Sequence, residues 1–372
     1  MANKITLENV AELKAQLATL SRNVAKSAFS GSDEFIVWFE KGSLLFYADG
    51  AGNMGYFWTS IQEKNISPVY VLPRMLTTKV VSILPENKPV TMEFTDKGVL
   101  LIRAGEGMEF SIRIGAGKKK PKIDVPPALA EFDLSLESLK EIQKKVVPCC
   151  SSASINPVGL ISQGGKTSIL ATDNHVMAKM ELPINSGKDF QAATAVAAWS
   201  MTFPSNLEKV HYRITENFVI ISGPNWSYLV SNLFGKLPPY DMVERNISKY
   251  GNEIRIEKEL LLQAMKAMEL MACSDTNIIL VSFGKEVLSL HTEDKDMGSI
   301  QMDVPYSARN KKDFAGKSVG FAYDFLAKGV NASENEVVIM TASPKEGTFP
   351  ISPVKFDTGK GCYMVVCPIR LH

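Results

Sequence analysis

An internal repeat with a period of about 120 residues constrains the fold of this chain more than any other feature of its sequence. In the segment Ala171–Met177, the turn formers Asp173 and Asn174 stand between strand-like runs at 167–170 and 176–182. Similar hairpin patterns occur at Asp49 and Asp294, so that aspartates mark the hairpin at nearly equal intervals. The repetition predicts that one supersecondary unit is used three times.

A second stretch supports the same period. Residues 90–102 align without a gap on residues 210–222, and the interval also superposes Gly115 on Gly235. A glycine at the same place in both copies indicates the same backbone requirement.

Each unit is expected to contain helices and strands in the order helix, strands, helix, strands. Apolar residues at spacings of three and four predict the helices, with Thr6 and Ser135 as N-caps of the first and the third. The helices are expected at about 7–20, 72–85, 136–146, 192–201, 257–268 and 321–330. Strands are expected at 35–39, 43–47, 55–59, 90–94, 99–103, 108–114, 167–170, 176–182, 210–214, 219–222, 336–341 and 363–368.

Two charged stretches that contain proline separate the units. The first, Gly115–Lys122, includes lysines that could contact phosphate, although a solvated linker is the simpler interpretation. The second begins at Pro238 and Pro239 and continues through 244–253. The predicted domains are therefore residues 1–125, 131–250 and 254–372.

The predicted elements indicate an α+β fold. Helices that are apolar on one face and strands that alternate must pack as a helix layer on a sheet. Three tandem, similar domains of this kind would form an arc with helices lining its inner face and antiparallel sheets outside. Two such arcs could close a ring by symmetric dimerisation.

The composition excludes several classes of protein. The chain has 372 residues and a net charge of +1, so any surface that binds nucleic acid must be a local patch. Irregularly spaced cysteines and dispersed histidines argue against a disulfide framework and against a zinc site. The N-terminus lacks the pattern of a signal peptide, and no apolar run approaches the roughly 20 residues that span a bilayer. We expect a cytoplasmic protein with no cofactor and no membrane contact.

Two motifs could suggest catalysis, but both are incomplete. Gly164–Thr167 resembles the end of a phosphate-binding loop, yet the preceding glycine is misplaced by one position and a strand follows, which favours a hairpin turn. Asp173 and His175 could form a catalytic pair, but no nucleophile elbow accompanies them. We expect no enzyme activity, and a hydrolase that uses this pair is the weaker alternative.

Basic residues recur on the predicted helices of all three units. On a single helix they would indicate only a solvated face, but their recurrence favours contacts with the phosphate backbone of duplex DNA, without base readout. The candidate DNA-binding residues are Lys14, Arg22, Lys26, Arg74, Lys79, Lys140, Lys144, Lys145, Lys258, Lys266 and Lys328.

The run Tyr363–His372 is apolar through Ile369. It is typical of an ordinary final strand, and it could also form part of an exposed apolar groove for a peptide.

Three segments resemble the bacterial-type DNA sliding clamp, the beta subunit of DNA polymerase III. Ala171–Met177 is similar to the family's Ala-Thr-Asp-Gly-His-Arg-Leu, Leu237–Val243 to its Phe-Pro-Asp-Tyr-Arg-Arg-Val, and Val365–Leu371 to its Val-Val-Met-Pro-Met-Arg-Leu. The matches stand in the family's order and spacing. The resemblance extends from about residue 132 to the end, and residues 44–58 are also similar.

The resemblance implies a processivity factor, a head-to-tail homodimeric ring that encircles duplex DNA. In that family the three segments build an apolar pocket between the second and third domains, which binds short linear motifs of the polymerase and the clamp loader. Carried over to this chain, the partner-binding pocket comprises Ile155, Thr172, Asn174, His175, Val176, Met177, Pro238, Met242, Val243, Val365, Val366, Cys367, Pro368 and Ile369.

The chain departs from the family pattern within this pocket. Val176 and Met242 stand where the family has arginines, and Asn174 stands where it has glycine. These changes imply a more apolar pocket of altered shape, and a divergent relative, such as one serving a phage replisome, would fit. A structural protein of repeated α+β units, for example a virion component, is the other alternative, and it would lack salt-sensitive retention on circular DNA.

Overall fold

The computed structural model describes residues 3–24, 33–50, 53–61, 68–122, 126–150, 157–203, 207–232, 237, 239–271, 277–294, 296–309, 311–342, 352–359 and 361–369. The chain divides into two compact units, one of Met1–Leu136 with Ser200–Asn232 and the other of Glu137–Trp199 with Leu233–His372. The division runs through the predicted middle domain, and the three domain boundaries stay a prediction. Among the described residues, no helix combines the length and apolar character needed to cross a membrane.

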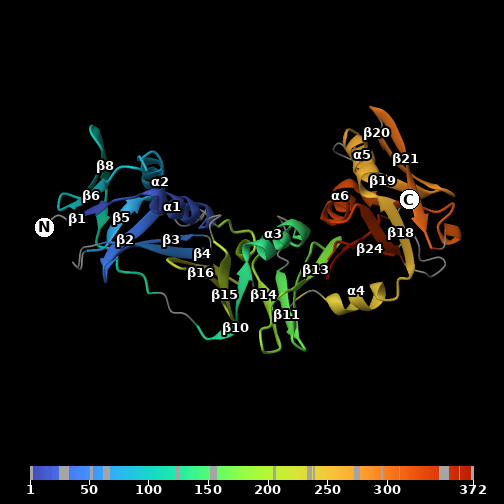
Figure 1. Ribbon diagram of the computed structural model, residues 1–372, viewed down its shortest axis with the longest axis horizontal. Coiled ribbons are helices and arrows are strands. Elements are labelled where there is room, and N and C mark those ends of the chain that lie inside the picture. The colour runs from blue at the N-terminus through green and yellow to red at the C-terminus, as the bar shows by residue number, and fades with distance from the viewer. Residues whose placement is uncertain are drawn as a thin grey trace. The chain divides into compact units, whose positions relative to one another are not determined.

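The first unit contains two antiparallel sheets and the helices α1 (Ala11–Asn23) and α2 (Arg74–Ser82), which lie side by side (Figure 1). A four-stranded sheet has the order β1 (Asn3–Leu7), β6 (Val90–Thr95), β7 (Val99–Ala104), β8 (Met108–Arg113). A nine-stranded sheet has the order β10 (Ala128–Ser135), β15 (Lys209–Thr215), β16 (Phe218–Gly223), β17 (Trp226–Ser231), β4 (Asn53–Ser60), β3 (Ser43–Gly50), β2 (Glu34–Glu40), β5 (Tyr70–Pro73), β9 (Gly115–Ala116).

The apolar stripe of α1 packs on the nine-stranded sheet. Leu13, Leu17 and Leu20 are buried, and the helix contacts β4. The two elements approach closely at Gly55, where a Cβ atom would lie 2.8 Å from Cδ1 of Leu20. The expected Thr6 cap is wrong, because Thr6 lies in β1 opposite Thr91, and α1 begins only at Ala11.

The second unit is built on one twelve-stranded sheet. Its order is β14 (Phe190–Thr194), β11 (Val158–Gln163), β12 (Lys166–Thr172), β13 (Val176–Leu182), β25 (Cys362–Val366), β24 (Val354–Asp357), β23 (Val337–Ala342), β18 (Asn252–Glu257), β21 (Gly298–Ala308), β20 (Val287–Asp294), β19 (Ile278–Phe283), β22 (Ser318–Ala322). Its helices are α3 (Leu136–Lys145), which begins at the boundary between the units, α4 (Tyr240–Ile247), α5 (Lys258–Glu269) and α6 (Tyr323–Ala332). The helices α5 and α6 contact each other.

Three sequence expectations need correction. The predicted helix at 192–201 is only the short 3-10 turn Val196–Ala198, which follows β14. The first linker is partly ordered in the sheet, because its residues Gly115–Ala116 form β9 and pair with β5. The charged stretch after Pro239 is not a simple boundary, because it begins with the helix α4.

The predicted repeat is visible in hydrogen bonds as well as in element order. Asp173 accepts the backbone N–H groups two and three positions ahead through Oδ1, and Asp294 does the same in the β20–β21 turn. Thr95 and Thr215 occupy equivalent turns, and each hydroxyl bonds both the N–H and the carbonyl of the first residue of the next strand.

The alignment of 90–102 with 210–222 nevertheless needs a gap. Val90 pairs with Ala104 in the first copy, whereas His211 pairs with Ser222 in the second. The second turn is therefore one residue shorter than the first. Gly235, the proposed counterpart of Gly115, lies outside the described residues.

Candidate functional site

The strands β13 and β25 bring two of the predicted pocket segments together. They pair in antiparallel fashion from Val176 opposite Val366 to Met180 opposite Cys362. Beyond the ladder, the N–H of Cys367 donates to the carbonyl of His175 at 2.8 Å. The turn after β12 and the C-terminal strand therefore lie side by side.

The helix α4 packs on one face of these strands and forms an apolar cluster with them. We call this the α4 cluster; its buried members are Leu170, Met177, Tyr240, Ile247 and Val365, and Ile161, Leu237, Val243, Tyr250 and Tyr363 pack against it partly buried. The approach is close at Gly159, where a Cβ atom would lie 2.5 Å from the Tyr240 hydroxyl. Glycine at this position allows α4 to lie against β11.

The strand period decides which predicted residues face α4. Met177 and Val365 pair directly and both belong to the α4 cluster. Val176 and Val366 pair one position along and project from the opposite face, where they are fully buried. These two valines are therefore core residues on the far side of the sheet from α4.

The remaining predicted pocket residues differ in exposure. Thr172 is buried, whereas Asn174, His175 and Met242 are exposed, Met242 to 58%. We use the name junction surface for the exposed and half-buried members, which are Asn174, His175, Met242, Val243, Cys367, Pro368 and Ile369. Ile155 and Pro238 lie outside the described residues.

The turn between β12 and β13 is fixed by its own side chains. Oδ1 of Asp173 accepts the N–H groups of His175 and Val176 at 2.9 and 2.7 Å. The Thr172 hydroxyl accepts the N–H of Asn174 at 3.0 Å. Asn174 has a φ of 74°, a region that asparagine and glycine adopt more readily than other residues.

The helix α6 contacts this turn from the third repeat. The ring of His175 stacks on Phe325 with centroids 5.1 Å apart, and Lys328 Nζ lies 3.2 Å from Oδ2 of Asp173. Both carboxylate oxygens of Asp173 are thus engaged in contacts within the chain. This arrangement suits a structural turn and gives no support to Asp173 and His175 as a hydrolytic pair.

A polar network also ties α4 to the sheet. Oε1 of Glu244 receives hydrogen bonds from Lys179, at 2.6 Å, and from the hydroxyl of Tyr363. Burial alone would raise the pKa of Glu244, but the hydrogen bonds from Lys179 and Tyr363 outweigh it and lower the pKa. The Nζ of Lys355 lies over the Tyr363 ring at 5.0 Å. The helix is therefore held by a charged contact as well as by apolar packing.

The thiols near this site are unreactive in character. Burial raises the pKa of Cys150 to about 11, and burial together with the charge of Asp173 raises the pKa of Cys367. Both are therefore protonated at neutral pH. In the part of the chain that the structure describes, no three or more His, Cys, Asp or Glu side chains gather in a way that could hold a metal ion.

The predicted DNA-binding residues fall into two groups. Arg22, Lys79, Lys140, Lys144 and Lys266 are exposed on their helices, Lys14 is half-buried beside Glu86, and Lys26 lies outside the described residues. Four others make contacts within the chain. The Arg74 guanidinium, 3% exposed, binds Asp33 and the Val24 carbonyl, and Lys258 donates to the carbonyl of Ser333.

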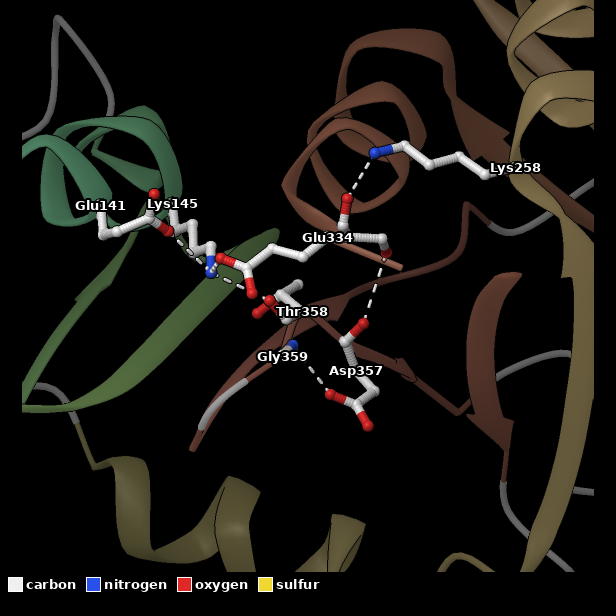
Figure 2. Close-up of polar contacts among 8 residues, drawn as sticks. Glu141, Lys145, Lys258, Glu334, Asp357, Thr358 and Gly359 are labelled. Carbon is white, nitrogen blue, oxygen red and sulfur yellow. Dashed lines mark hydrogen bonds and ion pairs between the residues drawn. The ribbon is translucent and has the colours of Figure 1, made fainter. Parts of the chain in front are cut away.

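Lys145 and Lys328 complete the second group. Lys145 is 3% exposed and lies in a network with Glu141 and Glu334 (Figure 2). Lys328 binds Asp173. Arg74 and Lys145 are buried too deeply to contact a phosphate backbone, so their expected role in DNA binding is not supported.

The loop Gly164–Gly165 is confirmed as a hairpin turn. Both glycines have positive φ, and Gln163 pairs with Lys166 across the turn.

Sequence reasoning missed the aromatic residues of the α4 cluster. Tyr240, Val243, Ile247 and Tyr250 follow one another at spacings of three and four, which is a helical signal. Charged residues between these positions make the helical signal hard to recognise in the sequence. Phe325 was also missed, since nothing in its local sequence indicates a partner at His175.

The comparisons with known proteins complete this description. No model of a protein family and no curated protein sequence matches the chain. Solved structures do match. The DNA polymerase III beta subunit of Thermotoga maritima is 17% identical with a TM-score of 0.86, and that of Streptococcus pneumoniae is 18% identical with a TM-score of 0.84; both matches cover 100% of each chain.

A sliding clamp of Pseudomonas aeruginosa, described as bound to griselimycin, is 15% identical with a TM-score of 0.85 over 99% of each chain. Sequence identity is low in all three comparisons, but the structural match extends over the full length. The chain therefore has the fold of the bacterial DNA sliding clamp, the beta subunit of DNA polymerase III.

Proposed function

We propose that this protein is a DNA sliding clamp, a processivity factor that encircles duplex DNA and tethers a polymerase. The observation that carries the proposal is the full-length match to clamp structures, with a TM-score of 0.86 and complete coverage of both chains. A partial match could reflect a shared module, but this one includes every repeat.

The exposed basic residues support non-specific contact with DNA. Lys140 and Lys144 lie on α3, Lys266 on α5, and Arg22 and Lys79 on the helices of the first unit. Such side chains contribute electrostatic attraction to the phosphate backbone without reading bases. On this proposal two copies form a head-to-tail ring, and the protein makes and breaks no bond.

The junction surface is the proposed binding site for partners. It combines the exposed apolar side chain of Met242 with the half-buried apolar tail Cys367–Ile369. A short apolar peptide of the polymerase or of the clamp loader would suit such a surface. Because Val176 is buried on the opposite face, Met242 and Asn174 are the departures from the family pattern that change the chemistry of this surface.

Loading on circular DNA tests the proposal. The protein is loaded onto nicked circular plasmid, separated from unbound protein by gel filtration, and the plasmid is then cut at a single site. A clamp stays on the circle and slides off the linear product. Equal retention on circular and linear DNA would instead indicate an ordinary DNA-binding protein.

A further inference from the structure

The floor of the α4 cluster depends on a short strand pair between the second and third repeats. β13 and β25 share a ladder from Val176–Val366 to Met180–Cys362, and one backbone hydrogen bond extends it at each end, from Cys367 to His175 and from Glu181 to Gly361. This ladder places Met177 beside Val365 under α4. A one-residue slip of this pair would move Met177 or Val365 off the face that carries α4, and the structure shows a lysine contact near each end of the pair.

Lys145 supplies the contact near the Cys362 end. From the last turn of α3, its Nζ reaches Glu334 at 2.5 Å, Glu141 at 2.9 Å and the carbonyl oxygen of Thr358 at 3.0 Å (Figure 2). Thr358 ends the β24 side of the turn into β25, and its N–H donates to the Cys362 carbonyl. Lys145 therefore holds the start of β25 from a helix of the preceding repeat.

The same network continues into the third repeat. Next to Glu334, the hydroxyl of Ser333 donates to the carbonyl of Asp357 at 3.3 Å, and the Ser333 carbonyl accepts from Lys258. The carboxylate of Asp357 accepts the N–H of Gly359. The turn that receives Lys145 is thus itself fixed to the ends of α6 and β24.

Lys145 is surrounded by carboxylates, and its positive charge offsets theirs. Burial alone would lower its pKa, but the hydrogen bonds to Glu334 and Glu141 outweigh burial and raise it. Glu137 and Glu181 line the same recess, and Lys145 is the only cation among the described residues that line it. Without Lys145, the carboxylates of Glu141 and Glu334 would lose the ammonium group that binds them both.

Lys328 supplies the contact near the other end. From α6 of the third repeat, it binds the carboxylate of Asp173, whose side chain is 7% exposed. Asp173 fixes the turn that leads into β13, and His175 in that turn accepts the N–H of Cys367. The two lysines therefore act across the junction in opposite directions, one from each repeat.

We propose that Lys145 and Lys328 are positioning residues that hold β25 in register beside β13 and thereby keep the junction surface assembled for a partner. The link to a partner rests on the proposed function, whereas the positioning itself does not. Both residues would otherwise be counted among the lysines that contact DNA.

Hydrogen exchange measured by mass spectrometry tests the proposal. Lys145→Met and Lys328→Met should each accelerate exchange of the β25 amides at least about tenfold, because each change removes the ammonium group that joins β25 or its turn to the other repeat and leaves buried or half-buried carboxylates without that contact. Lys144→Met is the matched control: it removes an exposed lysine from the same turn of α3 and should leave β25 unchanged. Unchanged β25 exchange in both junction variants would overturn the proposal.

Further readouts separate positioning from general loss of stability. In Lys145→Met and Lys328→Met, the Cys367 thiol should react faster with a thiol reagent. Amide hydrogen exchange in β19 and β22 of the same unit should stay as in the parent protein. Uniform acceleration throughout the unit would contradict the proposal. If Lys145→Met does not fold, the variant with Glu141→Gln and Glu334→Gln added removes the repulsion, and it should still show faster exchange in β25.

The outcome is distinguishable from that of the functional proposal. The exchange experiment uses no DNA and no partner, and the plasmid experiment uses none of these variants. A protein that is retained equally on circular and linear plasmid can still show faster β25 exchange in the two lysine variants. A protein that behaves as a clamp on the plasmid can still show unchanged β25 exchange in those variants.

Discussion

Asn174 occupies the left-handed region of backbone conformation, with a φ of 74°. Its N–H is bound by the Thr172 hydroxyl, so the conformation is set by the turn. A β-branched residue at this position should cost about 1–2 kcal/mol of unfolding free energy, because its Cβ crowds the backbone. We expect Asn174→Val to show this loss in urea denaturation, and Asn174→Gly to stay within about 0.5 kcal/mol of the parent protein.

The glycine variant is also the control for the side chain. If Asn174→Gly were as unstable as Asn174→Val, the amide group rather than the backbone conformation would be the cause. The similar segment of the clamp family has glycine at this position. Glycine and asparagine both adopt a positive φ, so stability alone does not require the asparagine.

At the residue scale the sequence indicates charge but not its partner. Lys140, Lys144 and Lys145 follow one another on α3 and look equivalent in the sequence, yet only Lys145 is buried. Its partner Glu334 belongs to the next repeat, and no local pattern indicates a contact over that distance. The same applies to Arg74, which the sequence suggests as a DNA-binding residue. Its partner Asp33 lies far from it in the sequence, and no local pattern indicates their ion pair.

At the scale of elements, periodicity predicts most of what the structure contains. The hairpin of β12 and β13 follows from strand-like runs around a turn, and α5 follows from apolar residues at helical spacing. The predicted helix at 192–201 is wrong because this alanine-rich stretch folds back on itself, where the indole N–H of Trp199 donates to the Thr194 hydroxyl. Helix propensity is overridden there by a buried hydrogen bond.

The helix α4 supports a prediction about partner binding. Met242 is exposed on α4, so Met242→Asp should leave stability nearly unchanged while placing a charge on the junction surface. We expect its affinity for the polymerase to fall at least about tenfold, since a buried unpaired charge is costly at an interface. Surface plasmon resonance with immobilised polymerase measures the change.

Two further variants test whether the loss of polymerase binding is specific to the junction surface. Leu129→Asp alters an exposed apolar residue of the first unit and should bind polymerase normally. Deletion of Cys367–His372 should abolish polymerase binding while the ring remains assembled, as judged by sedimentation. Normal binding by the truncated protein would remove the tail Cys367–Ile369 from the proposed partner site.

At the scale of the whole molecule, the fold is retained although only 14–18% of residues are identical to those of the clamp structures. Buried residues alternate along strands such as β6 and β20, and a pattern of this kind, rather than particular residues, is what packing requires. Strand pairing between repeats could not be derived from the sequence. β13 pairs with β25, and β17 with β4, through backbone groups that any edge strand offers.

Salt dependence of DNA binding tests which lysines face the duplex. For each phosphate group that the protein no longer neutralises, the slope of log affinity against log salt should become shallower by about 0.9. Lys140→Ala with Lys144→Ala should therefore flatten the slope for a short linear duplex, measured by fluorescence anisotropy. Lys145→Met should leave the slope unchanged, because its ammonium group is 3% exposed and already bound by Glu141 and Glu334. Equal flattening by both changes would place Lys145 on the DNA surface and would contradict its assignment to the junction.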